Sequence, residues 1–496
     1  MQNLEINPFS RRTLFKGTAL TCLASSAPLA KFIPNAYASS SSSLLGFPKT
    51  ISSKDGVLET TLTAQAGMRK TAGVNRWVMS YNNLLPGPVL IAKPGDTLKI
   101  KLENKLNIPT NLHVHGLHVS PLGNSDNPFI TVAAGKSFDY EIKILKNQNS
   151  GIFWYHPHHH GMVAAEEASG LYGMILIQDA IDQRPAFSGS DQLLLTLAAP
   201  VFGKDSSITK VSAAELAHGR SGNNVLINDQ LLPTFKVNQQ RPTRIALLNA
   251  DPSQLLTLKL SSGVFRVIAT AGGRLDNSYT SNILAINSGD RYEFLIENAK
   301  SGLVTLFQDK HTIAYFDNGG AKNNDFSKQI APTISKISTS KSRKITIEGH
   351  GQVAVAANSE DSGSMAGMDM SNNSMPGMDM SGSGAMMVHQ KTFTFNGASF
   401  NPQKVNELVK FGDSEEWVIE NKSTMEHPFH LHTWPFQIKD DGTGKALPGW
   451  RDVVTIPAHS TARIAIKFAD FSGATVYHCH ILDHEDQGMM GIVKVV

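Results

Sequence analysis

Residues 477–489 read Tyr-His-Cys-His-Ile-Leu-Asp-His-Glu-Asp-Gln-Gly-Met, and this stretch decides how the rest of the chain is interpreted. In an extended strand, successive side chains point to opposite faces. Cys479 would therefore face one side of such a strand, while His478 and His480 face the other. A thiolate, two imidazoles and a weakly bound thioether form the ligand set of a blue-copper electron-transfer site. Cys479, His484, Met489 and a histidine from upstream can supply that set, which leaves His478 and His480 for a second metal centre.

Three further histidine clusters can supply the remaining ligands of that second centre: His113-Val114-His115, His156-Pro157-His158 and His427-Pro428-Phe429-His430-Leu431-His432. Residues i and i+2 of a strand share a face, so each His-x-His can offer two imidazoles to adjacent metals. A single His-x-His is a weak signal, whereas four in one chain, one with an embedded cysteine, are a strong one. The pattern indicates a four-copper oxidase.

The rest of the chain has the pattern of β-sandwich domains. Short runs rich in Val, Ile, Leu, Phe and Thr alternate with Gly, Pro, Asn and Asp, as at 97–102, 292–296 and 462–468. A chain of 496 residues is long enough for about three domains of roughly 100 to 150 residues each. Three similar turn-then-strand units, which begin at Pro94-Gly95-Asp96, Ser288-Gly289-Asp290 and Phe411-Gly412-Asp413, suggest that these domains are related.

We expect domain boundaries near residues 180 and 348, with domains over 44–180, 181–348 and 388–496. Residues 349–387 are rich in Gly, Ser, Asn and Met and lack a periodic apolar pattern, which predicts a linker or lid. All the histidine clusters fall in the first and last domains. The middle domain is therefore expected to be a spacer.

The first 38 residues resemble a twin-arginine signal peptide. Arg11-Arg12 precede an apolar run over 17–30 and a small-x-small cleavage site at Ala36-Tyr37-Ala38. This predicts export through the Tat machinery and a periplasmic location. No other apolar run approaches the ~20 residues that span a bilayer, so the mature chain is expected to be soluble, without a membrane segment. Removal of the leader with Cys22 would leave Cys479 as the only thiol, which excludes an intrachain disulfide.

Charge gives no sign of a nucleic-acid partner. The chain has 45 lysine and arginine residues and 42 acidic residues, which gives a formal net charge of +3. It contains no run of five or six like charges, the pattern typical of a nucleic-acid-binding tail.

The four histidine motifs resemble those of three-domain multicopper oxidases of the bacterial copper-efflux-oxidase and laccase type, and the resemblance extends from about Leu58 to Val496. It implies an all-β fold of three cupredoxin-like Greek-key β-sandwich domains and four copper ions: one blue type 1, one type 2 and a coupled type 3 pair. By the same resemblance, the type 1 site takes His427, Cys479, His484 and Met489. The type 2 copper takes His113 and His430, and the type 3 pair takes His115, His156, His158, His432, His478 and His480. Because each terminal domain supplies four of these eight histidines, we expect the cluster between domains one and three.

Catalysis by such a protein couples one-electron donors to the four-electron reduction of dioxygen to water. Cys479 would receive the electron at the type 1 site, and its neighbours His478 and His480 would deliver it. The resemblance also implies Asp126 and Glu485 as acids that feed protons to the cluster, although either could be a solvated or salt-bridged carboxylate. His118, His159 and His160 lie beside ligands but outside the motifs, and His160 is the strongest rival ligand.

The methionine-rich segment suggests the substrate. Thioethers are soft ligands that select Cu(I), and the segment carries an imperfect repeat, Met-Ala-Gly-Met-Asp-Met and Met-Pro-Gly-Met-Asp-Met. We hypothesise that cuprous ions are captured by Met365, Met368, Met370, Met375, Met378 and Met380. The alternative is a low-complexity linker that happens to contain methionine.

The predicted function is thus a monomeric periplasmic oxidase of Cu(I), with phenols or other small organic reductants as further donors, in copper tolerance. A laccase or a ferroxidase in vivo is the second enzyme hypothesis, and Asp369, Asp379, Asp440 and Asp441 keep iron binding open. A copper-binding resistance protein without turnover, or a structural relative without copper, is the third.

Overall fold

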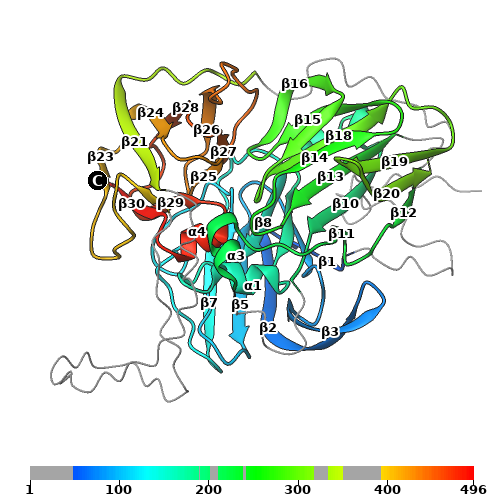
Figure 1. Ribbon diagram of the computed structural model, residues 1–496, viewed down its shortest axis with the longest axis horizontal. Coiled ribbons are helices and arrows are strands. Elements are labelled where there is room, and N and C mark those ends of the chain that lie inside the picture. Colours follow the sequence, from blue (N-terminus) through cyan, green and yellow to red (C-terminus); the bar gives the residue numbers. More distant parts are fainter. Residues whose placement is uncertain (1–47, 189, 202–210, 238–241, 318–332, 350–392) are drawn as a thin grey trace, which may run out of the picture. The chain divides into compact units, whose positions relative to one another are not determined.

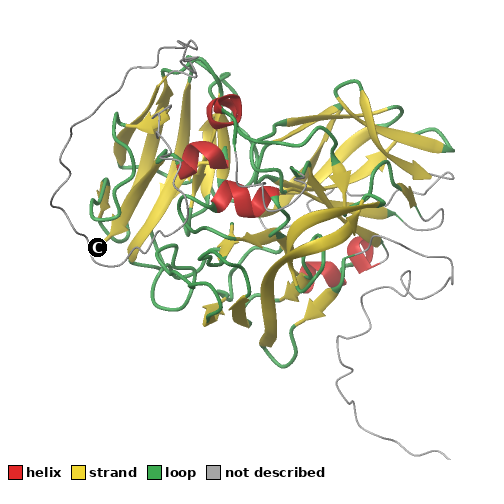
Figure 2. Cartoon of the chain, turned by 60° about the horizontal axis from the view of Figure 1, so that its bottom comes forward, coloured by secondary structure: helices red, strands yellow, loops and turns green. Residues whose placement is uncertain are grey.

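The computed structural model describes residues 48–188, 190–201, 211–237, 242–317, 333–349 and 393–496. The expected leader and the methionine-rich segment lie outside these residues. Strands dominate the described chain, and its helices are few and short (Figure 1, Figure 2). The predicted all-β fold is confirmed. None of the helices in the described ranges combines the length and apolar character needed to cross a membrane.

The first two sheets are built from residues 50–177. One has the strand order β1-β4-β9-β8-β6 and the other β3-β2-β5-β7. Apolar side chains from both sheets, such as Leu58, Ile100 and Phe153, share one buried core. The strands are β1 (Thr50–Ser52), β2 (Val57–Thr71), β3 (Val74–Tyr81), β4 (Val89–Ala92), β5 (Thr97–Asn104), β6 (His113–His115), β7 (Ser137–Lys143), β8 (Gly151–His156) and β9 (Gly173–Ile177).

The second pair of sheets spans residues 191–317, with the orders β11-β10-β13-β18-β15-β16 and β12-β20-β19-β14-β17. Its core includes Leu195, Leu258 and Phe294. The strands are β10 (Asp191–Ala198), β11 (Leu226–Ile227), β12 (Thr234–Lys236), β13 (Thr243–Asn249), β14 (Leu256–Leu260), β15 (Val264–Thr270), β16 (Gly273–Ser281), β17 (Ile283–Ile286), β18 (Arg291–Glu297), β19 (Leu303–Gln308) and β20 (His311–Asp317).

The third pair spans residues 341–495, with the orders β22-β21-β24-β28-β26 and β23-β30-β29-β25-β27. Trp417, Phe429 and Cys479 belong to its core. The strands are β21 (Lys341–Gly349), β22 (Phe393–Phe395), β23 (Glu407–Val409), β24 (Ser414–Asn421), β25 (His427–Leu431), β26 (Phe436–Asp440), β27 (Val453–Ile456), β28 (Thr461–Lys467), β29 (Gly473–Cys479) and β30 (Met490–Val495). Because β21 pairs with β24, the third pair of sheets begins ahead of residue 348, where the sequence suggested a boundary.

The three sandwiches share a strand arrangement, which supports their relatedness. A parallel pair followed by an antiparallel partner recurs as β2-β5-β7, β10-β13-β18 and β21-β24-β28. The turns at Gly95 and Gly412 precede β5 and β24, which are equivalent strands. The turn at Gly289 instead precedes β18, the counterpart of β7 and β28. The middle member of the sequence repeat therefore lies in a different place in its sandwich.

Between the first and second sandwiches, apolar strand faces pack directly on each other. Trp154, Met174 and Leu176 of β8 and β9 contact a cluster that includes Leu194 of β10 and Leu248 of β13. These strands are buried on both faces, which explains their nearly continuous apolar sequences.

The helices are short connecting elements, and two of them contact a third. They are α1 (Val163–Ala168), the 3-10 turn η3 (Ala180–Gln183), α2 (Pro185–Ser188), α3 (Ala213–His218) and α4 (Leu482–Asp486). Both α1 and α3 contact α4 (Figure 1). Asp486 of α4 accepts hydrogen bonds from the backbone amides of Val163 and Ala164 at the start of α1. On the other side, Asp483 of α4 forms a buried ion pair with Arg220, just beyond α3. The short helix α4 is thus held by all three sandwiches.

Candidate metal centre

Strands β25 and β29 separate two groups of ligand candidates onto opposite faces of one sheet. The strands are antiparallel, with Phe429 opposite Cys479 and His430 opposite His478. Residues opposite each other share a face, and neighbours along a strand alternate. Cys479 therefore faces the core of the third sandwich with Phe429, whereas His430 and His478 face away from it. All four residues are fully buried.

The first sandwich presents its histidines from β6 and β8. His113 lies opposite His156, and His115 lies opposite Trp154. The indole ring of Trp154 stacks on the imidazole of His156, with ring centroids 4.2 Å apart. His158, however, lies beyond the end of β8, as His432 and His480 lie just beyond β25 and β29. Strand alternation therefore does not reach His158, His432 and His480, which are placed by the turns that end their strands.

One group of donors surrounds the sulfur of Cys479. Its Sγ lies 3.5 Å from Nδ1 of His427 and 3.8 Å from Nδ1 of His484. Nε2 of His484 lies 3.1 Å from the carbonyl oxygen of Ala217, which can only accept, so that nitrogen carries the proton. The lone pair on Nδ1 of His484 therefore faces the sulfur. Met489 is buried in the same apolar core.

The hydroxyl of Ser423 determines in the same way which ring nitrogen of His427 carries the proton. It lies 2.9 Å from Nε2 of His427 and donates to Oδ1 of Asn421 at 2.8 Å, so it accepts the proton of that nitrogen. Burial also raises the pKa of the Cys479 thiol, which is neutral until a metal ion displaces its proton.

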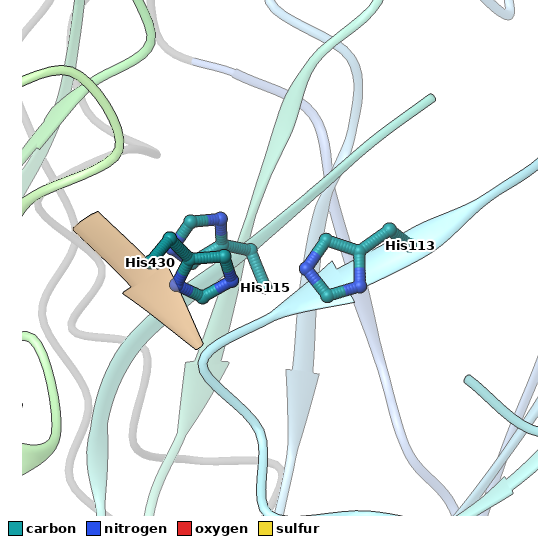
Figure 3. Close-up of side chains that lie close together, drawn as sticks. All are labelled: His113, His115 and His430. Atoms are coloured by element: carbon teal, nitrogen blue, oxygen red, sulfur yellow. The ribbon is translucent and has the colours of Figure 1, made fainter. Parts of the chain in front are cut away.

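The eight other motif histidines converge in three groups. In each group, one donor atom per residue lies within 4.8 Å of the others: His113, His115 and His430; His115, His156 and His480; and His158, His432 and His478. Figure 3 shows the first group, in which the rings of His115 and His430 stack at a centroid distance of 3.8 Å and His113 lies beside them. Every group joins residues from the first and third sandwiches.

Hydrogen bonds on the outer side of several of these rings fix which nitrogen faces inward. Nδ1 of His430 lies 2.7 Å from the carbonyl oxygen of Asp452, and Nδ1 of His478 lies 3.0 Å from that of Cys479. Both nitrogens must donate, so both Nε2 atoms carry lone pairs. Nε2 of His478 lies 3.1 Å from Nε2 of His158 and 3.1 Å from Nε2 of His432.

Several ring nitrogens of the motif histidines are buried and have no hydrogen-bond partner in the described chain, among them Nε2 of His113, of His430 and of His480. A buried polar atom without a partner costs about 1–3 kcal/mol, and several such atoms aimed at one place indicate a site for a ligand that accepts lone pairs.

The imidazoles of the cluster are neutral, which is the form that binds metals. Burial lowers the pKa of His156 to about 3 and that of His430 to about 4. Burial, with neighbouring imidazoles as a further cause, holds the pKa of His113 and of His432 well below the usual value. Imidazole donors beside a thiolate site suit copper, so the residues present fit copper cofactors.

Both predicted acids lie next to the cluster. Oδ1 of Asp126 is 2.8 Å from Nδ1 of His113, and burial raises the pKa of Asp126 to about 8. Glu485 is fully buried, with Oε2 3.5 Å from Nδ1 of His478 and Oε1 3.8 Å from Nδ1 of His158. Burial raises the pKa of Glu485 well above its usual value. Their role in supplying protons remains a prediction.

A third carboxylate contacts the cluster and was not predicted. Oε2 of Glu167 lies 3.0 Å from Nδ1 of His156, and both side chains are fully buried. The sequence signal was Glu166-Glu167 among apolar residues close to the His156 motif, because acidic residues in a buried helix need a partner.

Other predicted residues have different contacts or fall outside the described residues. His160, the predicted rival ligand, is exposed, and its ring packs against that of Phe400 with the ring centroids 4.9 Å apart. Asp440 and Asp441 accept hydrogen bonds from the backbone of their own turn, at Gly442 and Thr443. The six candidate methionines and the other two aspartates, Asp369 and Asp379, fall outside the described residues.

Comparisons with known proteins agree with this chemistry. Two family models described as multicopper oxidase match residues 63–182 and 371–496. A multicopper oxidase of Staphylococcus haemolyticus is 31% identical over 467 residues, which cover 90% of this chain and 92% of the relative. A laccase of Bacillus subtilis is 24% identical, covering 83% of this chain and 88% of the relative.

Solved structures give the same result. A multicopper oxidase from Campylobacter jejuni, described as a metallo-oxidase, superposes with a TM-score of 0.75 at 25% identity, covering 91% of this chain and 94% of that one. The laccase-like CueO of a lignin-degrading Ochrobactrum also gives a TM-score of 0.75 at 25% identity, covering 91% of this chain and all of that one.

Proposed function

Because the chain belongs to the multicopper oxidase family, and is thus an oxidoreductase that uses dioxygen, we propose that it oxidises Cu(I) in the periplasm as part of copper tolerance. In this proposal phenols and other small organic reductants are further donors, and dioxygen is reduced to water.

The observation that carries the proposal is the convergence of eight buried histidines next to a buried Cys479, with several lone pairs directed inward. In our assignment, the type 1 copper is held by His427, Cys479, His484 and Met489. His113 and His430 hold the type 2 copper, and the remaining six histidines hold the type 3 pair.

Copper, when bound, supplies the one-electron chemistry and the reduction of dioxygen. The chain supplies orientation and protons. Oδ1 of Asp126 lies 2.8 Å from Nδ1 of His113 and would accept the proton of that nitrogen. Glu485 provides a buried acidic group beside His158 and His478. The aromatic and apolar walls, such as Trp154, exclude water from the cluster.

Support for Cu(I) as the substrate comes from the soft thioether ligands concentrated in the methionine-rich segment. The test is steady-state turnover of Cu(I), Fe(II) and a phenol by the full chain and by a variant that lacks residues 358–387. The deletion should reduce Cu(I) oxidation far more than phenol oxidation, and equal losses would refute the assignment.

A laccase that acts on organic donors is the second candidate function. It is supported by the relatives described as laccases, among them the Ochrobactrum enzyme with oxidase activity towards lignin model compounds. Iron oxidation has less support, because Asp440 and Asp441 already bind their own turn. Faster turnover of the phenol than of Cu(I) by the full chain would favour the laccase.

A further inference from the structure

The middle sandwich reaches the metal cluster through the turn that joins β17 to β18. Ser288 in this turn is 1% exposed. Its Oγ lies 2.8 Å from Nδ1 of His480 and also within hydrogen-bond distance of the carbonyl oxygen of Asp251. Ser288 and His480 are 192 residues apart in the sequence and belong to different sandwiches.

The direction of the hydrogen bonds follows from the number of protons available. A carbonyl oxygen only accepts, so the single O–H of Ser288 is donated to Asp251. Towards His480, the hydroxyl oxygen can then only accept, so Nδ1 of His480 carries the proton. Nε2 of His480 is left with its lone pair, and that atom is buried without a partner among the described residues.

Gly289, the next residue of the turn, brings the backbone close to two ligand rings. Its φ is +78°, and a Cβ atom there would lie 2.9 Å from Nε2 of His480 and 3.1 Å from Cε1 of His115. A side chain at this position would push both rings. The turn therefore contacts the cluster through a hydrogen bond and through close packing.

We infer that Ser288 is a positioning residue for His480, so that the middle sandwich, expected from the sequence to be a spacer, sets the orientation and proton position of one cluster ligand. The inference rests on the proposed function for the identity of the metal. It predicts that Ser288 affects copper binding to the cluster and leaves the Cys479 site intact, because Ser288 contacts none of the donors around that sulfur.

The test compares Ser288→Ala with Ser190→Ala in the full-length protein. Ser190 is a matched control, because it is a 2% exposed serine of the same sandwich that donates to Phe187 and accepts from Arg244. Copper per chain is measured during titration with a competing chelator, and the absorption band of the Cys479 site is recorded with it. The thermal midpoint of each copper-free variant reports on stability alone.

Residues that orient metal ligands typically change metal affinity 10- to 100-fold. Ser288→Ala should therefore release cluster copper at roughly 10- to 100-fold lower chelator concentration, with the Cys479 band retained, and Ser288→Thr, which keeps the hydroxyl, should recover most of the affinity. Ser190→Ala should bind copper like the unmodified protein. If Ser288→Ala retains copper as firmly as Ser190→Ala does, the inference is overturned while the proposed function stands. If the unmodified chain binds no copper, both are overturned.

Discussion

Arg291 should be one of the largest single contributors to the stability of this fold. Its guanidinium is fully buried, and all five N–H groups are used. Nε donates to the carbonyl of Ile152 in the first sandwich, and the two terminal nitrogens donate to the carbonyls of Gly289 and Ala271 in the second. The same two nitrogens bind both carboxylate oxygens of Asp452 in the third, at 2.8 and 2.6 Å.

Replacement of this arginine by methionine keeps much of the volume and removes the charge. The carboxylate of Asp452, which is 2% exposed, would be left buried without its counter-ion. Removal of one partner of a buried ion pair costs about 3–5 kcal/mol, a large share of the roughly 5–15 kcal/mol of a typical native protein. We expect Arg291→Met to lower the free energy of unfolding by that amount.

Arg463→Met is the matched control. Arg463 forms an ion pair with Glu416 at 2.9 Å, but its side chain is 49% exposed, and such surface pairs contribute about 0–1 kcal/mol. Copper-free proteins are unfolded with urea and followed by tryptophan fluorescence and by far-ultraviolet circular dichroism, and coincident curves test for a two-state transition. If Arg291→Met is no less stable than Arg463→Met, the ion pair does not hold the sandwiches together as reasoned.

Three further predictions concern the site and the pH dependence of stability. Cys479→Ser should abolish both the intense red absorption and the oxidation of organic donors without changing the circular dichroism, and retained oxygen uptake would contradict the role of the sulfur. Asp126→Asn should slow oxygen consumption under saturating donor, whereas unchanged turnover would remove Asp126 from proton supply. Burial raises the pKa of Asp229 to about 7 in the folded state, whereas the pKa of an aspartate in the unfolded state is about 3.9. Between these two pH values the folded state keeps a proton on Asp229 that the unfolded state has lost. The stability that this proton contributes is complete below about pH 4 and is lost as the pH rises through about 7. The unfolding midpoint of copper-free Asp229→Asn should therefore decrease less between pH 4.5 and 7.5 than that of the unmodified protein. Equal decreases in the two proteins would contradict the raised pKa of Asp229.

Local periodicity made much of the architecture predictable. A strand places neighbours on opposite faces wherever it lies, so the separation of Cys479 from His478 could be read from three consecutive residues. The same reasoning failed where strands end, as at His158, because the direction of a side chain in a turn depends on the backbone that follows.

Contacts between sandwiches could not be predicted, because they depend on docking rather than on local pattern. His484 and Ala217 are 267 residues apart in the sequence, and no feature of the sequence near Ala217 marks its carbonyl as a partner. The sequence indicates a turn at Ser288-Gly289-Asp290, but its similarity to the turns at Gly95 and Gly412 gives no sign that it precedes a strand in a different place of its sandwich. The prediction of a bare spacer rested on the absence of histidine motifs, which says nothing about hydroxyl and carbonyl groups.

Helix α4 has a consequence for the order of assembly. It carries His484 and Glu485, yet it is only five residues long, and an isolated helix of that length is unstable in water. Its anchors are the amides at the start of α1 and the guanidinium of Arg220, so two other sandwiches must be in place before it is held. A partly assembled chain would leave the sulfur donor without one of its imidazole neighbours. We therefore expect the complete set of donors around Cys479 to form only after the three sandwiches have docked.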